Sequence, residues 1–164
     1  MHPKGSKARL ALLIFLLTGA SRQDAAALEK NNMEGGRVSY SRGKTRVAAL
    51  LPILPELAEE LALLPEDQVP LLAHGAGRKY KAETLGNWFR DQCVAAGLPH
   101  CSAHGLRKAG ATRLAEAGAT EWEIASYLAH KDTKMASIYV QKANRALLAD
   151  NGMARLRPVE AKKP

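Results

Sequence analysis

The sequence has little of what marks a secreted or membrane-bound protein. Its 164 residues include only two cysteines, Cys93 and Cys101, too few for the disulfide framework of a small secreted domain. We therefore expect a reducing, cytoplasmic location. The apolar run from Leu10 to Leu17 is too short to cross a bilayer, so no membrane partner is expected. Basic residues before this run and small residues after it give it the outline of a signal peptide, which is the alternative to a buried first helix that ends at Thr18-Gly19.

Two kinds of site are missing as well. The chain has no glycine-rich phosphate loop of the nucleotide-hydrolase kind, which argues against a reaction driven by ATP. His100, Cys101 and His104, together with Cys93, could suggest zinc, but their spacing matches no standard structural site. We expect neither a metal nor an organic cofactor.

Acidic residues are scarce relative to basic ones. The chain has 24 Lys and Arg against 16 Asp and Glu, which gives a formal net charge of +8. Such an excess favours a polyanionic partner, and a merely basic soluble protein is the alternative on charge alone. Hydrophobic residues make up 46% and charged residues 24% of the chain, as in ordinary globular domains. A chain of this length can bury one substantial core.

Hydrophobic periodicity, caps and turn residues predict a mainly α domain with a small antiparallel β-sheet. The alternating stretch 37–41 and the apolar stretch 46–51 form a hairpin, joined by a turn at Arg42-Gly43-Lys44-Thr45. A short third strand is expected at 70–74. The basic stretch 75–81 is a loop that either tracks a phosphate backbone or is a solvated turn. Helices are expected over residues 9–17, 22–28, 56–64, 82–96, 104–117, 120–130 and 143–148.

The residues that suggest chemistry lie between His104 and Tyr139. His104 and Arg107 are three residues apart on a predicted helix and share a face. His130 and then Tyr139 follow after further helix. Arginine offers a planar fork of donors to phosphate oxygens, histidine moves a proton near neutral pH, and a tyrosine hydroxyl can form a phosphate ester. The four side chains together indicate one pocket for a phosphate and a nucleophile.

This pattern resembles the C-terminal catalytic domain of the tyrosine recombinases, or phage-type integrases. The family carries H-x-x-R, a helical hairpin, a Gly-His pair and then a tyrosine, which here are His104-Gly105-Leu106-Arg107, Ala129-His130 and Tyr139. The resemblance runs from about Arg9 to Asn151. A lone H-x-x-R would be a weak signal, but all these elements in this order and at these spacings are specific.

The resemblance implies cleavage and rejoining of double-stranded DNA through a 3′-phosphotyrosyl intermediate at Tyr139. Arg107 would clamp the phosphate, His104 would accept the tyrosine proton, and His130 would hydrogen-bond or position a phosphate oxygen. Lys44 in the hairpin turn matches the family's lysine that is thought to protonate the leaving 5′-oxygen. The alternative for Lys44 is an ordinary exposed turn lysine.

Two positions depart from the family pattern. The family opens its second helix with T-G-x-R-x-x-[E/D]; Thr18-Gly19 and Asp24 fit this pattern, but Ser21 occupies the arginine position. Arg22 comes one residue later, about 100° further round the helix. We expect Arg22 to replace the missing arginine, and the alternative is an impaired enzyme. The second departure is Ala129, where glycine is usual and where the change adds only a methyl group.

The resemblance also implies an organisation for the chain. Residues 1–8 are expected as a disordered lead, 9–152 as the catalytic domain and 153–164 as a flexible basic tail. Nothing corresponds to the family's N-terminal DNA-clamping domain, so a fragment, a truncated gene product or a stand-alone catalytic domain that binds DNA weakly is expected. The family also implies a homo-tetramer on DNA, with residues from Gln141 onward exchanged between neighbours. Two alternatives stay open, a catalytically impaired DNA-binding remnant and a basic helical protein with an unrelated partner.

Overall fold

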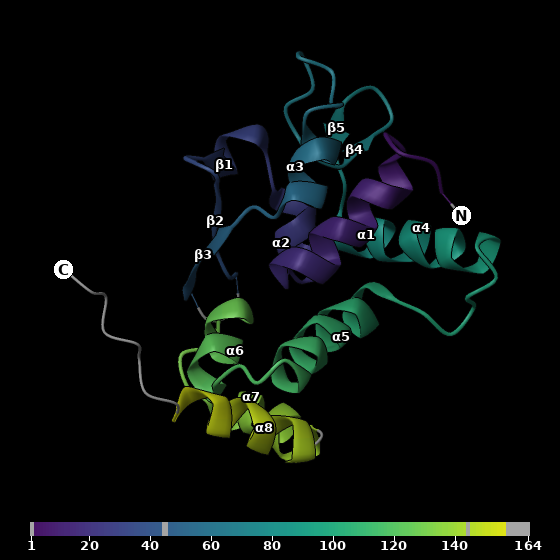
Figure 1. Cartoon of the computed structure of the whole chain (residues 1–164). Coiled ribbons are helices and arrows are strands. Elements are labelled where there is room, and N and C mark those ends of the chain that lie inside the picture. The colour runs from purple at the N-terminus through teal and green to yellow at the C-terminus, as the bar shows by residue number, and fades with distance from the viewer. Residues whose placement is uncertain (1, 44–45, 144, 157–164) are drawn as a thin grey trace.

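The computed structural model describes residues 2–43, 46–143 and 145–156. These residues are mainly helical and form two small antiparallel sheets, which confirms the predicted fold class (Figure 1). None of the described helices is both long and apolar enough to span a membrane. The elements in chain order are α1 (Lys7–Thr18), α2 (Arg22–Ala27), the short 3-10 helix η1 (Lys30–Asn32), β1 (Met33–Glu34), β2 (Arg37–Ser41), β3 (Ala48–Pro52), α3 (Pro55–Leu61), β4 (Ala73–His74), β5 (Arg78–Lys79), α4 (Ala82–Ala95), α5 (Ala103–Glu116), α6 (Glu121–Tyr127), α7 (Lys134–Lys142) and α8 (Arg145–Arg155).

The larger sheet has the strand order β1-β2-β3 and contains the predicted hairpin. Within the hairpin Val38 lies opposite Leu51 and Tyr40 opposite Ala49. Side chains alternate along β2, so Val38 and Tyr40 are buried while their neighbours face solvent. The short third strand is present as β4, and it pairs with β5 inside the stretch 75–81 that we expected to be a loop.

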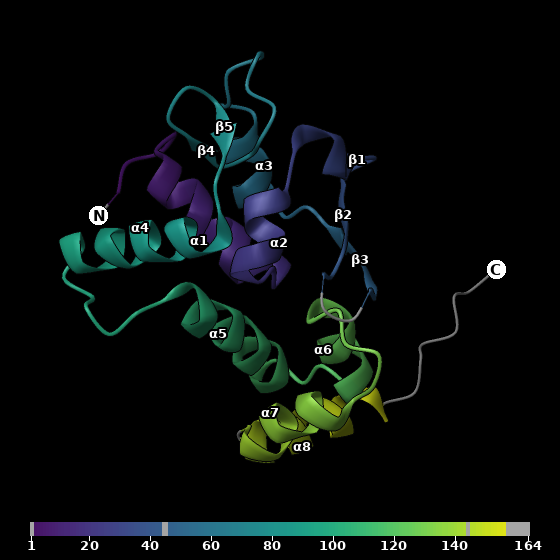
Figure 2. The same cartoon turned by 180° about the vertical axis from the view of Figure 1, so that it is seen from behind.

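Two hydrophobic clusters fill the molecule, and α5 runs between them. Figures 1 and 2 show the sheets and α1 to α4 as one group, with α5 to α8 as a second group beside it. Ile14, Phe15 and Leu85 are fully buried in the first cluster, and Ile124 and Ala136 in the second. α1 packs on α5, and β3 contacts α6. The end of the hairpin therefore lies against the second group of helices.

The first helix begins at Lys7, within the stretch 1–8 that we expected as a lead. α1 begins at Lys7 because Ser6 caps it, and the Ser6 hydroxyl accepts from the Arg9 backbone amide at 3.3 Å. The Gly5 amide donates to the buried carboxylate of Glu60 at 2.9 Å, and Arg9 pairs with the same carboxylate at 2.8 Å. Glu60 thus ties this segment to α3.

Tyr139 lies on α7, a helix that was not among those expected from the sequence. At the start of α7 the Lys134 backbone amide donates to the Asp132 carboxylate at 3.2 Å. Ala136 is fully buried, and α7 packs on both α5 and α6. The polar start of this helix resembles a connector in the sequence, and the helix depends on packing against its neighbours.

α8 runs to Arg155, past the end that we expected for it. Asn151 and Arg155 donate to the backbone carbonyl oxygens of Ala117 and Gly118, at 3.3 Å and 3.4 Å. These contacts with the turn after α5 outweigh the helix-ending tendency of the Asp-Asn-Gly sequence. Most of the expected flexible tail, residues 157–164, lies outside the described residues.

Gly110 marks the closest approach of α5 to its neighbours. A Cβ atom at this position would lie 2.0 Å from the Tyr127 hydroxyl oxygen and 2.8 Å from the Leu16 carbonyl oxygen. That hydroxyl donates to that carbonyl at 2.7 Å, so neither group can move aside without losing the bond. The Gly110→Ala variant should therefore lose about 3 kcal/mol of unfolding free energy, at the upper end for overpacking. Urea unfolding followed by circular dichroism measures the loss.

Gly105 provides the matched control on the same helix. A Cβ atom there would meet only the Ser102 hydroxyl oxygen, at 3.4 Å. The Gly105→Ala variant should be as stable as the wild type or up to about 1 kcal/mol more stable, because alanine favours the helix. Equal effects of the two substitutions would contradict the close approach at Gly110.

Candidate active site

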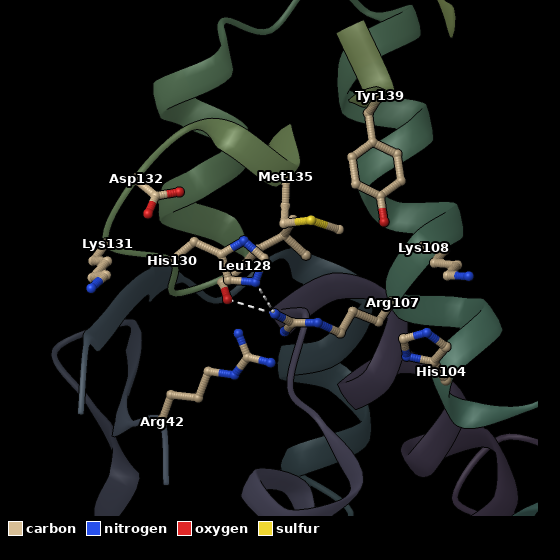
Figure 3. A pocket seen from close by; sticks show the side chains of 10 residues that line it. All are labelled: Arg42, His104, Arg107, Lys108, Leu128, His130, Lys131, Asp132, Met135 and Tyr139. Carbon is tan, nitrogen blue, oxygen red and sulfur yellow. Dashed lines mark hydrogen bonds between the residues drawn. The ribbon is translucent and has the colours of Figure 1, made fainter. Parts of the chain in front are cut away.

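A cavity of about 500 Å³ lies between α5, α7 and the end of the β2–β3 hairpin (Figure 3). It brings together four of the predicted site residues, His104 and Arg107 from α5, His130 from the turn after α6, and Tyr139 from α7. Residues 104 and 139 are far apart in sequence, so the pocket exists only in the folded chain. Its other lining residues are Arg42, Lys108, Leu128, Lys131, Asp132 and Met135.

Arg107 is the buried cation of this pocket, with only 6% of its surface exposed. Its Nη2 atom donates to the Leu128 carbonyl oxygen at 2.6 Å and lies 3.2 Å from His130 Nε2. Because arginine has no acceptor, His130 accepts at Nε2 and carries its proton on Nδ1. The buried Nη1 atom has no hydrogen-bond partner among the described residues. Burial, followed by the charge of Arg42, lowers the pKa of Arg107. A bound anion would stabilise this buried charge and accept a hydrogen bond from the unpaired Nη1 atom.

The turn after α6 holds Leu128 and His130 against Arg107. The Ala129 amide donates to the Ser126 carbonyl at 3.1 Å, and the His130 amide donates to the Ala125 carbonyl at 2.9 Å. These are the two bonds of a Schellman motif. Ala129 takes its left-handed position, with a φ of 46°, where glycine is favoured. The departure from glycine that we noted here therefore concerns backbone strain as well as a methyl group.

Both histidines of the pocket favour the neutral form. Burial, followed by the charge of Arg107, lowers the pKa of His130. Burial, followed by the charge of Lys108, lowers the pKa of His104. A neutral imidazole can accept a proton, so His104 at the rim of the cavity can act as a base.

The Tyr139 hydroxyl points from α7 into the cavity, toward the side chains of α5 (Figure 3). The ring is half-buried, and the packing of α7 on α5 and α6 holds its backbone in place. Four lysine and arginine side chains line the cavity, against the single carboxylate of Asp132. A hydroxyl beside cations and neutral imidazoles suits attack on a phosphodiester.

Arg22 faces a neighbouring cavity rather than the one that holds Tyr139. At the start of α2 the Ser21 hydroxyl accepts from the Asp24 amide at 3.2 Å and donates to the Asp24 carboxylate at 2.6 Å. Ser21 thus caps the helix, while Arg22 lies against Gly86 of α4, where a Cβ atom would be 2.7 Å from Arg22 Cδ. This second cavity, of about 830 Å³, adjoins the first through two shared residues of α5.

The hairpin contributes a residue that we did not predict. Lys44 lies outside the described residues, so its role as a proton donor stays a prediction. Arg42, which we assigned to the turn, lines the cavity with a half-buried side chain. The signal lay in the alternation of β2, since Val38 and Tyr40 face inward and Arg42 continues that face.

The fold is that of a tyrosine recombinase catalytic domain. The model of the phage integrase family matches residues 2–145, and the chain belongs to that family. The resemblance found in the sequence is thereby confirmed. No curated protein matches the chain at a significant level.

Solved structures of recombinases share this fold at low sequence identity. The Tn1549 transposon integrase, solved in complex with transposon right end DNA, has a TM-score of 0.74 at 17% identity, over 93% of this chain and 59% of that one. A lambda integrase dimer bound to a COC′ core site has a TM-score of 0.69 at 21% identity, over 85% and 53%. XerA recombinase has a TM-score of 0.71 at 16% identity, over 93% and 57%. The chain spans little more than half the length of these structures.

Proposed function

We propose that the chain is the catalytic domain of a site-specific DNA recombinase or integrase. One observation carries the proposal, the meeting of Arg107, His104, His130 and Tyr139 in a single cationic cavity. The similar proteins solved on DNA support double-stranded DNA as the partner. The net charge of +8 agrees, because phosphate contacts supply much of the affinity for DNA.

In the proposed reaction the Tyr139 hydroxyl attacks a backbone phosphorus of DNA. The bond between Tyr139 Oη and phosphorus forms as the bond to the 5′-oxygen breaks, which gives a 3′-phosphotyrosine and a free 5′-hydroxyl. His104 accepts the tyrosine proton, and Lys44 donates the proton that the leaving oxygen needs. A second 5′-hydroxyl then reverses the step and joins a new strand. The ester retains the bond energy, so no ATP is required.

Arg107 and His130 would stabilise the charge that gathers on the phosphate during the attack. The unpaired Nη1 atom of Arg107 is a donor that no group among the described residues uses, and its Nη2 atom holds His130. Donors that are already oriented stabilise a transition state without the cost of rearrangement. His130 would present the proton on Nδ1 to a phosphate oxygen.

We further infer that the protein acts as a homo-tetramer on DNA through the segment from Gln141 onward. None of the described residues of α8 is buried; Leu148 packs against the second cluster, and Asn151 and Arg155 donate hydrogen bonds to the turn after α5. An element with so little buried surface can leave its domain at low cost. The lambda integrase dimer on DNA supports assembly on the substrate. A cytoplasmic location, as the cysteine count suggests, would give access to DNA.

The second candidate is a DNA-binding remnant that has lost strand cleavage. The direction of Arg22 favours it, since the expected replacement for the family arginine lines the neighbouring cavity. A remnant would keep the basic surface and retain DNA without reacting with it.

Trapping the covalent intermediate tests the proposal. The chain is incubated with a pool of nicked duplexes of randomised sequence, in which the short strand released by cleavage diffuses away and cannot be rejoined. We expect a protein–DNA complex that survives denaturation. After nuclease and protease digestion, mass spectrometry should find the nucleotide on the peptide that contains Tyr139.

The other outcomes separate the alternatives. DNA retained without a covalent complex would support the remnant. Attachment at a residue other than Tyr139 would overturn the proposed mechanism. If the DNA were neither retained nor attached, the result would support the unrelated basic protein.

A further inference from the structure

The end of β2 is anchored so that Arg42 faces the cavity. The Arg42 amide donates to the Val47 carbonyl at 3.0 Å, and its own carbonyl accepts from the Arg46 amide at 2.8 Å. The Gly43 amide donates to the Asp24 carboxylate at 3.3 Å, which ties this end of the hairpin to α2. The amide and carbonyl groups of Arg42 and the next amide along the chain are thus all hydrogen-bonded. A side chain on such a fixed backbone is well positioned to bind a ligand.

The guanidinium groups of Arg42 and Arg107 enter the same space from different walls of the cavity (Figure 3). Within residues 2–43, 46–143 and 145–156, no carboxylate forms an ion pair with Arg42. Arg107 also keeps its unpaired buried Nη1 atom. Two cations that form no ion pair repel each other, and an anion between them turns that repulsion into attraction to both. The charge of Arg42 acts on Arg107 and on His130, lowering the pKa of each, which agrees with this proximity.

Arg22 does not have this geometry. Its side chain lies along α4 beside Gly86, and it lines the neighbouring cavity together with Arg90. A guanidinium in that position can attract DNA to the surface, but it does not face the Tyr139 hydroxyl across the cavity.

We propose that Arg42 is a second phosphate-binding arginine of this active site, which acts from the hairpin and fills the role that we expected of Arg22. The inference rests on the proposed function and adds a residue to it. Arg42 would hydrogen-bond a non-bridging oxygen of the phosphate that Tyr139 attacks. It would transfer no proton, and it would stabilise the negative charge of the transition state together with Arg107.

Removing the side chain on its own hairpin gives the sharpest test. On a nicked duplex recovered from the trapping experiment, the Arg42→Ala variant should form the covalent complex about 100-fold more slowly than the wild type, the usual loss for one such donor. Arg46→Ala removes an exposed arginine of the same hairpin and should change the rate by less than about threefold. Arg22→Ala should likewise lose far less than Arg42→Ala.

A neutral phosphate separates direct contact from mere support of the fold. A methylphosphonate at the attacked position removes one negative charge, so the ratio of wild-type to Arg42→Ala rates should fall from about 100 to below about 10. If Arg42 only supported the hairpin, the ratio would be the same on both substrates. An unchanged ratio, or an Arg42→Ala rate within about threefold of the wild type, would overturn the inference. In that case the recombinase proposal would still stand on the wild-type complex.

Inorganic phosphate gives a second readout that needs no cleavage. It should raise the unfolding temperature of the wild type and of Arg46→Ala, because an anion that binds only the folded state stabilises it. The rise should be clearly smaller for Arg42→Ala. If the wild type formed no covalent complex, the recombinase proposal would fail, and equal rises for the two variants would independently overturn the phosphate site at Arg42.

Discussion

Replacing Tyr139 with phenylalanine should abolish the covalent protein–DNA complex while the protein still folds and still retains DNA. Of the described residues that line the cavity, Tyr139 alone carries a hydroxyl, so none of the others can replace it as the nucleophile. The ring itself stays, and the unfolding free energy should change by no more than about 0.5 kcal/mol. Retention should persist because phosphate contacts from lysine and arginine do not involve the hydroxyl. Denaturing gels and filter binding on the same DNA measure the two effects.

Tyr80→Phe is the matched control for this substitution. Tyr80 packs beside Trp88 and accepts a hydrogen bond from Lys7 at 2.7 Å, outside the cavity. This variant loses one hydroxyl of the same kind and should form the complex at the wild-type rate. A covalent complex that persisted in Tyr139→Phe would assign the nucleophile to another residue.

Replacing Arg107 with methionine should slow formation of the complex by about 10²–10³-fold with little change in stability. The buried guanidinium gives two contacts, to Leu128 and His130, but its Nη1 atom is unpaired and its charge is desolvated. Removal of an uncompensated buried charge offsets the lost hydrogen bonds, so the unfolding free energy should stay within about 2 kcal/mol of the wild type. Single-turnover trapping measures the rate of complex formation, and urea unfolding of the same preparation measures the unfolding free energy.

Two further variants test whether the slower reaction of Arg107→Met comes from the loss of this particular guanidinium. Arg113→Met removes an exposed arginine from the same helix and should leave the rate near that of the wild type. Arg107→Lys keeps the charge but not the planar fork, and it should recover little activity. A large loss of stability in Arg107→Met, with activity falling in proportion, would show that Arg107 serves the fold rather than the reaction.

Local patterns in the sequence predicted much of the fold and four of the ten residues that line the pocket. The three-residue spacing places His104 and Arg107 on one face of α5, and the capping box of Thr120 and Glu123 starts α6 where expected. These features depend on residues that are close in sequence. The same holds for the β2–β3 hairpin, whose alternation is visible in the residues themselves.

The rest depends on contacts between distant segments, which no local pattern contains. The direction of Arg22 is set by Gly86, which lies on another helix and leaves room for the side chain. The place of Arg42 beside Arg107 depends on how the hairpin docks, and Asp24 takes part in this docking through the Gly43 amide. α7 and the end of α8 likewise form because of packing and carbonyl contacts with other helices.

The order of the pocket residues along the chain determines the order in which they become available for folding during synthesis. During synthesis the first cluster, built from α1 to α4 and the strands, has all but a few of its residues before α5 emerges. Arg42 has then been made, but its cavity partners have not, and Tyr139 on α7, the proposed nucleophile, comes last. Because domains form from the N-terminal side as the ribosome proceeds, a nascent chain would lack the proposed nucleophile until α7 has been made and has docked. A product released upstream of α7 would lack Tyr139 and, with it, the proposed strand cleavage.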